Sequence, residues 1–183
     1  MRLRTLFSFA LVTAIAAPLS AQNVMVGGET MYRTKDIVSN AVNSKDHTTL
    51  VAAVKAAGLV QTLQGKGPFT VFAPINGAFA VLPAGTVDNL LKPENKAALT
   101  GLLTYHVLAG RYTARDIIAA IRRGHGTAEF TTVNGQHLWA MMNGPMNVVL
   151  KDATGGVSNI STYDVLQSNG VIHVIDHVLM PKM

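Results

Sequence analysis

The sequence contains no cysteine. A disulfide framework, a zinc site built from thiolates and a thiol nucleophile are therefore all excluded. Charged residues make up only 14% of the chain and aromatic residues only 6%, whereas 49% of the residues are hydrophobic. A protein of this composition has to be held together by an apolar core, and 183 residues suffice to build one within a single domain.

The sequence also lacks a concentration of charge. The formal net charge is +5, and the basic residues are scattered along the chain. A surface that binds nucleic acid typically clusters Lys and Arg and interleaves them with aromatic residues. No such cluster occurs, so we predict that nucleic acid is not a partner.

The N-terminus carries a short apolar run. Residues 5–17 are uncharged and mostly apolar; they follow Arg2 and Arg4 and lead to small residues that end at Ala21. The run is shorter than the roughly 20 residues that a transmembrane helix needs, and this order of segments is typical of a secretory signal peptide. We predict a signal peptide over residues 1–21, a secreted or periplasmic location, and no transmembrane segment after its removal. An uncleaved N-terminal anchor is the alternative.

The patterning after the signal peptide predicts a short arm and one domain. Residues 22–34 show no sustained periodicity and contain two adjacent glycines, which indicates a linker or loosely held arm. From residue 35 to residue 183 the apolar periodicity continues without an interior linker or repeat. We therefore predict a single domain over residues 35–183.

Helical and strand patterns are segregated along this domain. In the first half, capping residues and helical spacing predict helices around one strand; in the second half, Asn-Gly and Gly-Gly pairs separate short alternating runs. The predicted helices cover residues 50–57, 60–63, 76–81, 87–91, 94–103 and 114–123, and the predicted strands cover residues 69–73, 129–133, 137–141, 147–150 and 171–179. Helices followed by a β-meander predict an α+β domain and disfavour a βαβ nucleotide-binding fold.

Two histidines near the C-terminus have the spacing of metal ligands. His173 and His177 are four residues apart, as in a zinc-protease helix, but the glutamate expected beside the first histidine is missing. The β-branched residues around them predict a strand in which both histidines share one face. We therefore predict no zinc site there.

A second group of possible ligands surrounds Trp139. His137, Met141, Met142 and Met146 offer imidazole and thioether groups, which suit Cu(I). Methionines also fill irregular gaps in an apolar core, and this is the more common arrangement. We therefore predict no metal and no cofactor, and copper binding by these four residues is the weaker alternative.

No arrangement of residues typical of catalysis occurs. The sequence has no Gly-x-Ser-x-Gly elbow for a nucleophile, and the glycines around Lys66 lack the length and ending of a phosphate loop. We therefore predict that the protein is not an enzyme. Tyr105 and His106 directly follow a predicted helix, a position typical of hydrogen-bonded core groups.

Three segments resemble the signature blocks of a known family. Residues 70–79, the pair Tyr105–His106 and residues 168–181 are similar in order and spacing to those of fasciclin (FAS1, β-Ig-H3) domains. The resemblance covers the whole predicted domain, and two short segments in its second half extend it to single-domain secreted proteobacterial members. The signature residues, mainly structural, are Thr70, Phe72, Pro74, Asn76, Phe79, Asn169, Gly170, His173 and Pro181.

The resemblance implies a fold and local roles for several residues. It implies a wedge or antiparallel β-sandwich with a helical layer, with helices mostly in the N-terminal half. It also implies that Pro74 ends a strand, that Asn76 caps the helix that follows, and that Gly170 supplies a hairpin turn.

The function that the resemblance implies is binding. Members of the family adhere to cells, matrix or host components, so the expected partner is a cell-surface, matrix or host protein or polysaccharide. The Tyr-His region is associated with receptor contact in animal members, which implies a partner-binding role for Tyr105 and His106 beside the core role indicated by their position. The alternative function is a periplasmic carrier, either of a small ligand in a cleft between sheet and helices or of copper at the group formed by His137 and the three methionines.

Overall fold

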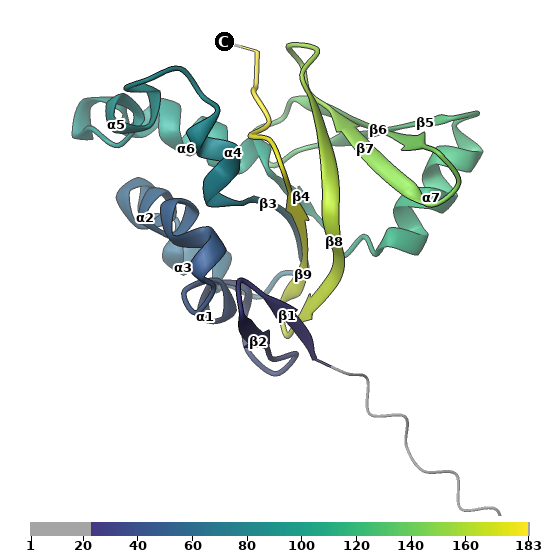
Figure 1. Cartoon of the computed structure of the whole chain (residues 1–183), viewed down its shortest axis with the longest axis horizontal. Coiled ribbons are helices and arrows are strands. Elements are labelled where there is room, and N and C mark those ends of the chain that lie inside the picture. Colours follow the sequence, from purple (N-terminus) through teal and green to yellow (C-terminus); the bar gives the residue numbers. More distant parts are fainter. Residues whose placement is uncertain (1–22, 183) are drawn as a thin grey trace, which may run out of the picture.

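In the computed structural model, which describes residues 23–182, helices gather in the first half of the chain and most strands in the second (Figure 1). The helices are α1 (Ile37–Ala41), α2 (Thr48–Ala57), α3 (Val60–Leu63), α4 (Asn76–Ala80), α5 (Thr86–Leu90), α6 (Lys96–Tyr105) and α7 (Ala114–Arg123), with 3-10 turns η1 (Lys45–His47) and η2 (Pro93–Asn95). The strands are β1 (Val24–Val26), β2 (Glu29–Met31), β3 (Phe69–Pro74), β4 (Val107–Ala109), β5 (Thr127–Thr131), β6 (His137–Asn143), β7 (Asn147–Lys151), β8 (Val157–Gln167) and β9 (Gly170–Ile175). The α+β prediction is confirmed, while the predicted signal peptide lies outside the described residues.

The helix ends follow local capping chemistry. Gly58 ends α2 in the left-handed region, at φ 74°, and its N–H donates to the Lys55 carbonyl oxygen. Thr113 begins α7 with a capping box, because its hydroxyl accepts the Asp116 N–H and the Asp116 carboxylate accepts the Thr113 N–H. Within residues 23–182, no helix combines the length and the apolar character needed to cross a bilayer.

Seven strands form one sheet in the order β4-β3-β9-β8-β7-β6-β5. Five of the neighbouring pairs are antiparallel, whereas β3 and β9 run parallel, with Phe72 beside His173. The resemblance implied antiparallel strands, and the β3–β9 pair is the exception among the described strands. The β8–β9 hairpin places β9, the last strand, between β3 and β8. The pairing of β3 with β9 joins segments far apart in the sequence, so no periodicity of the sequence indicates it.

The sheet separates two apolar cores. In Figure 1 the helices α1–α6 lie on the left of the sheet and α7 lies on the right. On β3, Val71 and Ala73 belong to the core beneath α1–α6, and Phe72 belongs to the core that includes the buried side of α7. Because β3 and β9 are buried on both faces, their side chains form the centre of the molecule.

The arm predicted at residues 22–34 contains structure. β1 and β2 pair as a hairpin, with Gly27 and Gly28 at positive φ in the turn. Val26 and Met31 are buried in the first core, and the Tyr32 N–H donates to the Asn40 side-chain oxygen at 2.9 Å. Strands of three residues are too short to produce a visible alternation, so the sequence indicated only irregular chain.

Gly170 is needed for close approach rather than for a turn conformation. It opens β9 opposite Phe69, and neither Gly170 nor Asn169 has a positive φ. A Cβ atom on Gly170 would collide with the Phe69 carbonyl oxygen and would lie 2.9 Å from Cδ1 of Ile37. The parallel pairing of β3 and β9 therefore requires glycine here.

The substitution Gly170→Ala is expected to lower the free energy of unfolding by about 2 kcal/mol, because the strands must separate to accept the methyl group. Gly101→Ala is the matched control: Gly101 lies inside α6, and a Cβ atom there meets nothing within 4 Å. The control is expected to raise stability by about 0.5–1 kcal/mol, since alanine favours helix. Urea denaturation of both variants measures the two effects, and equal values would contradict the close-approach argument.

Candidate functional site

Tyr105 lies in the core at the end of α6. Its side chain is fully buried. The hydroxyl donates to the His137 carbonyl oxygen at 2.8 Å and accepts the Ala153 N–H at 2.9 Å. Tyr105 thus connects α6 to β6 and to the turn between β7 and β8.

His106 is buried beside it, with 3% of its surface exposed. Its Nδ1–H donates to the Leu102 carbonyl oxygen at 2.9 Å, and Nε2 accepts the Leu179 N–H at 3.0 Å, so one neutral tautomer satisfies both contacts. Burial lowers the pKa of His106 to about 4. Both side chains are buried and their polar atoms have partners within the protein, so the geometry favours the core role, and partner binding by Tyr105 and His106 stays a prediction.

Two signature residues of the first block connect separate segments. The Thr70 hydroxyl donates to the Gly110 carbonyl oxygen and accepts the Tyr112 N–H, both at 2.8 Å. Asn76 is the first residue of α4 and does not cap that helix. Its side chain instead accepts the Thr49 N–H at 3.0 Å, so it caps α2, a correction to the role that the resemblance implied.

The remaining signature residues lie in or beside the core. Asn169 accepts the Ile37 N–H at 3.0 Å and donates to the carbonyl oxygens of Leu63 and Gly65 at 2.8 and 3.0 Å, which holds α1 and α3 against the β8–β9 turn. The other members are Phe72 and Phe79, which are buried, Pro74, which ends β3, and Pro181, which is half-buried near the C-terminus.

His173 is a fully buried structural residue. Its Nε2–H donates to the Tyr112 carbonyl oxygen at 2.8 Å, and Nδ1 accepts the Asp164 N–H at 3.4 Å. Burial lowers its pKa. The predicted strand 171–179 is too long: β9 ends at Ile175, so His177 lies outside the strand with 53% of its side chain exposed, and the two histidines share no face.

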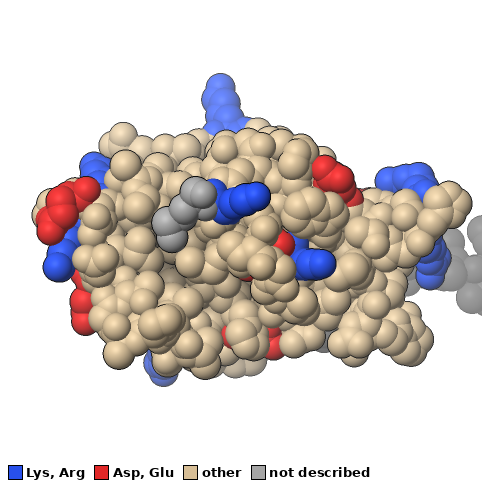
Figure 2. Space-filling model, turned by 90° about the horizontal axis from the view of Figure 1, so that it is seen from above, with Lys and Arg blue, Asp and Glu red and all other residues tan. Residues whose placement is uncertain are grey.

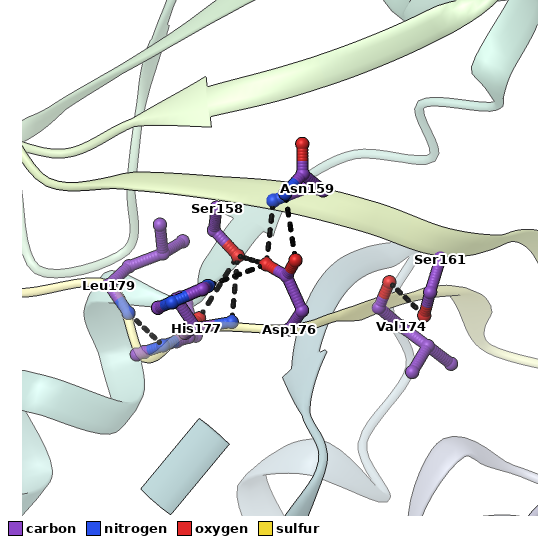
Figure 3. A network of polar contacts seen from close by, with 8 residues as sticks. Ser158, Asn159, Ser161, Val174, Asp176, His177 and Leu179 are labelled. Atoms are coloured by element: carbon purple, nitrogen blue, oxygen red, sulfur yellow. Dashed lines mark hydrogen bonds and ion pairs between the residues drawn. The ribbon is translucent and has the colours of Figure 1, made fainter. Parts of the chain in front are cut away.

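A polar cluster at the end of β9 contains serine, aspartate and histidine (Figure 3). Asp176 accepts hydrogen bonds from His177 and from two nitrogens of Asn159 at 2.8 Å, and from Ser158 at 3.1 Å. Burial raises the pKa of Asp176, but these hydrogen bonds outweigh it and lower the pKa to about 2. The Ser158 hydroxyl contacts the carboxylate and the His177 backbone, not the imidazole, so the three residues are not arranged as a catalytic triad.

The residues of the copper alternative are not brought together. On β6, Met142 packs against the second core, whereas His137 and Met141 belong to the alternate positions of the strand. His137 Nδ1 lies 2.7 Å from the Glu129 carboxylate, and Met146 is 76% exposed. Over residues 23–182, no group of three or more His, Asp or Glu side chains could hold a metal ion.

An apolar cavity of about 290 Å³ lies between the helical layer and the sheet. Its walls come from α1, α2 and α3, from β3, and, where α6 meets β4, from Leu103, Thr104, His106 and Val107. A cleft between sheet and helices was expected only under the alternative function, and the sequence did not predict its lining residues. They are ordinary aliphatic residues at helical and strand spacing, so no signal distinguishes them from core.

Asp152 is a structural residue that sequence reasoning missed. It is buried, and its carboxylate accepts the N–H groups of Thr154, Gly156 and Met180 at 2.8–2.9 Å. It therefore holds the β7–β8 turn against the C-terminal segment. The sequence signal was available, since an aspartate shortly before Thr-Gly-Gly is typical of a side-chain-stabilised turn.

Comparison with known proteins identifies the family. The fasciclin domain model matches residues 45–181. Protein sll1483 of the cyanobacterium Synechocystis is 47% identical over 148 residues, covering 80% of this chain and 74% of that protein. Transforming growth factor-beta-induced protein ig-h3 of Sus scrofa is 39% identical over 134 residues, covering 73% of this chain and 17% of that protein.

A solved structure agrees with the fold. The FAS1 domain pair of the insect cell adhesion molecule Fasciclin I superposes with a TM-score of 0.70 at 18% identity, covering 80% of this chain and 51% of that chain. The relatives above come from a cyanobacterium and a mammal, so they support membership of the family in general and not of a proteobacterial subgroup. The chain belongs to the fasciclin (FAS1) domain family.

Proposed function

We propose that this protein is an exported adhesion module that binds an anionic component of a cell surface, matrix or host through its fasciclin domain. Fasciclin domains are in general binding modules without catalytic activity. A protein with the same fold is described as a cell adhesion molecule, and the N-terminal segment of this chain has the pattern of a signal peptide.

The exposed side of α7 is the surface that supports this proposal. Ile117 and Ile121 are buried against the second core, and Arg115, Arg122 and Arg123 are exposed. Among the residues from 23 to 182, none of these arginines takes part in an ion pair. In Figure 2 acidic and basic side chains alternate at the left-hand end, whereas basic ones without an acidic neighbour lie at the right-hand end, on the side where α7 lies in Figure 1.

Three exposed arginines on one helix favour a partner rich in carboxylate or sulfate groups. Guanidinium groups bind such oxyanions through paired hydrogen bonds. Each exposed contact contributes about 1 kcal/mol or less, so a single domain is expected to bind weakly. Adhesion then depends on many copies acting together on one surface.

The experiment compares protein displayed on beads with free protein, on cells and on immobilised uronate or sulfated polysaccharide. Exported protein whose N-terminal sequence begins at Gln22 is the starting material. The triple variant R115Q/R122Q/R123Q is expected to lose at least ten-fold in bead retention. The triple variant K66Q/K92Q/K96Q has the same change of charge outside α7, and it should retain binding. Equal loss in both variants, or no retention of the unmodified protein, would overturn the proposal.

A further inference from the structure

We propose that the apolar cavity beneath α1–α3 binds a medium-chain aliphatic carboxylate, with Lys55 at the rim as the partner of the headgroup. This site is separate from the surface of α7 and does not depend on the adhesive role.

The size of the cavity is the first observation. Protein interiors are packed at the density of organic crystals and contain few voids larger than a water molecule. A cavity of about 290 Å³ approaches the lower end of the range of ligand sites. It lies under α1 and α3, which have five and four residues and are held in place through Asn169.

The walls exclude a polar ligand body. They consist mainly of Val, Leu, Ile, Ala and Phe side chains, among them Leu50, Val54 and Ile172. Both His106 ring nitrogens and the hydroxyls of Ser39 and Thr104 already have partners in the protein. The other uncharged polar lining residues, Thr62 and Gln64, are exposed. A water molecule inside would lack the two to four polar partners that it needs, so the space suits hydrocarbon.

The volume limits the length of the hydrocarbon. A cavity of about 150 Å³ accommodates benzene, with six carbon atoms, so about twice that volume accommodates about ten to twelve carbon atoms. A saturated chain of this length is flexible enough to follow an irregular space between helices.

The rim determines the headgroup. Among the described residues that line the cavity, Lys55 and His106 are the ionisable ones, and His106 is neutral and buried. Lys55 is exposed in the last turn of α2, and within residues 23–182 it forms no ion pair. A cation beside an apolar space is complementary to an acid with an aliphatic tail.

The test is a calorimetric titration of the protein with dodecanoate, dodecanol and dodecylammonium, each below its micellar concentration. Dodecanoate is expected to bind most tightly and dodecylammonium most weakly. Lys55→Gln should lower the affinity for dodecanoate about three- to five-fold and leave that for dodecanol unchanged. Lys151→Gln, on β7, is the matched control and should change neither affinity.

A second variant tests the cavity itself. Val51→Trp places a large ring in the partly exposed wall and is expected to abolish binding of dodecanoate and dodecanol, whereas Val81→Trp, outside the cavity, should not. Thermal unfolding of both variants establishes that they are folded. If Val51→Trp unfolds, the acid series from hexanoate to hexadecanoate decides, because affinity should stop rising near twelve carbons.

Three outcomes would overturn the inference. The first is no binding of any amphiphile, and the second is affinity that rises without limit along the acid series, which indicates surface adsorption. The third is equal affinity for dodecanoate and dodecylammonium, which removes the role of Lys55.

Discussion

Replacing His106 by alanine is expected to lower the free energy of unfolding by about 3 kcal/mol. The imidazole donates to the Leu102 carbonyl oxygen and accepts the Leu179 N–H in a buried position, and its removal leaves both backbone groups without a partner. Each unsatisfied buried group costs about 1–3 kcal/mol, and the empty space adds to this loss. Urea denaturation measures the change.

His177→Ala is the matched control, because His177 is an exposed histidine whose polar contact is with Asp176 at the surface. Its expected effect is about 1 kcal/mol or less. If the His106→Ala variant instead had an unchanged free energy of unfolding and no longer bound cells, His106 would be a contact residue. The buried position described for its side chain would then be wrong.

Acidification from pH 6.5 to pH 4 is expected to remove about 3 kcal/mol of stability through His106 alone. Burial lowers its pKa in the folded protein to about 4, from the ordinary histidine value of 6.5. Between these pH values the histidine is protonated in the unfolded chain but stays neutral in the folded protein. The free energy of unfolding is therefore highest above pH 6.5 and decreases as the pH approaches 4. Burial also lowers the pKa of His47 and His173, which adds to the loss in the same direction.

The measurement is the free energy of unfolding in urea at pH 7, 5.5 and 4. His106→Gln keeps a polar side chain but has no titrating group, so its stability should depend less steeply on pH than that of the unmodified protein. A flat profile between pH 7 and pH 4 would contradict the buried, neutral state of His106. The Asp176 carboxylate contributes little to the change between pH 7 and pH 4. Its stabilising effect is lost only as the pH falls from the ordinary pKa of 3.8 toward the folded pKa of about 2.

The parts of the fold that depend on local chemistry could be predicted from the sequence. Gly58 and Thr113 mark the end of α2 and the beginning of α7, because a left-handed glycine and a capping threonine act within one turn of helix. The Asn-Gly pairs that end at Gly135 and Gly144 likewise predict hairpin turns, and in the structure both glycines have positive φ.

Features that depend on long-range contacts could not be predicted. Strand β8 was missed because its alternation is broken by register shifts between Ile160 and Val165, where Asp164 has a φ of 55°. The burial of Tyr105 and His106 depends on Ala153 and Leu179, which are 48 and 73 residues away. The position of the pair after a helix indicated a core role, but only the folded structure shows which backbone groups form hydrogen bonds with the two side chains.

The position of β9 has a consequence for the order of synthesis. β3 pairs with a strand made about 100 residues later, so the centre of the sheet stays open until the last segment of the chain has emerged. Residues of β9 belong to both apolar cores, so neither core is complete before that point. Under the export that we propose, the same delay would leave the polypeptide unfolded for its passage through a membrane pore.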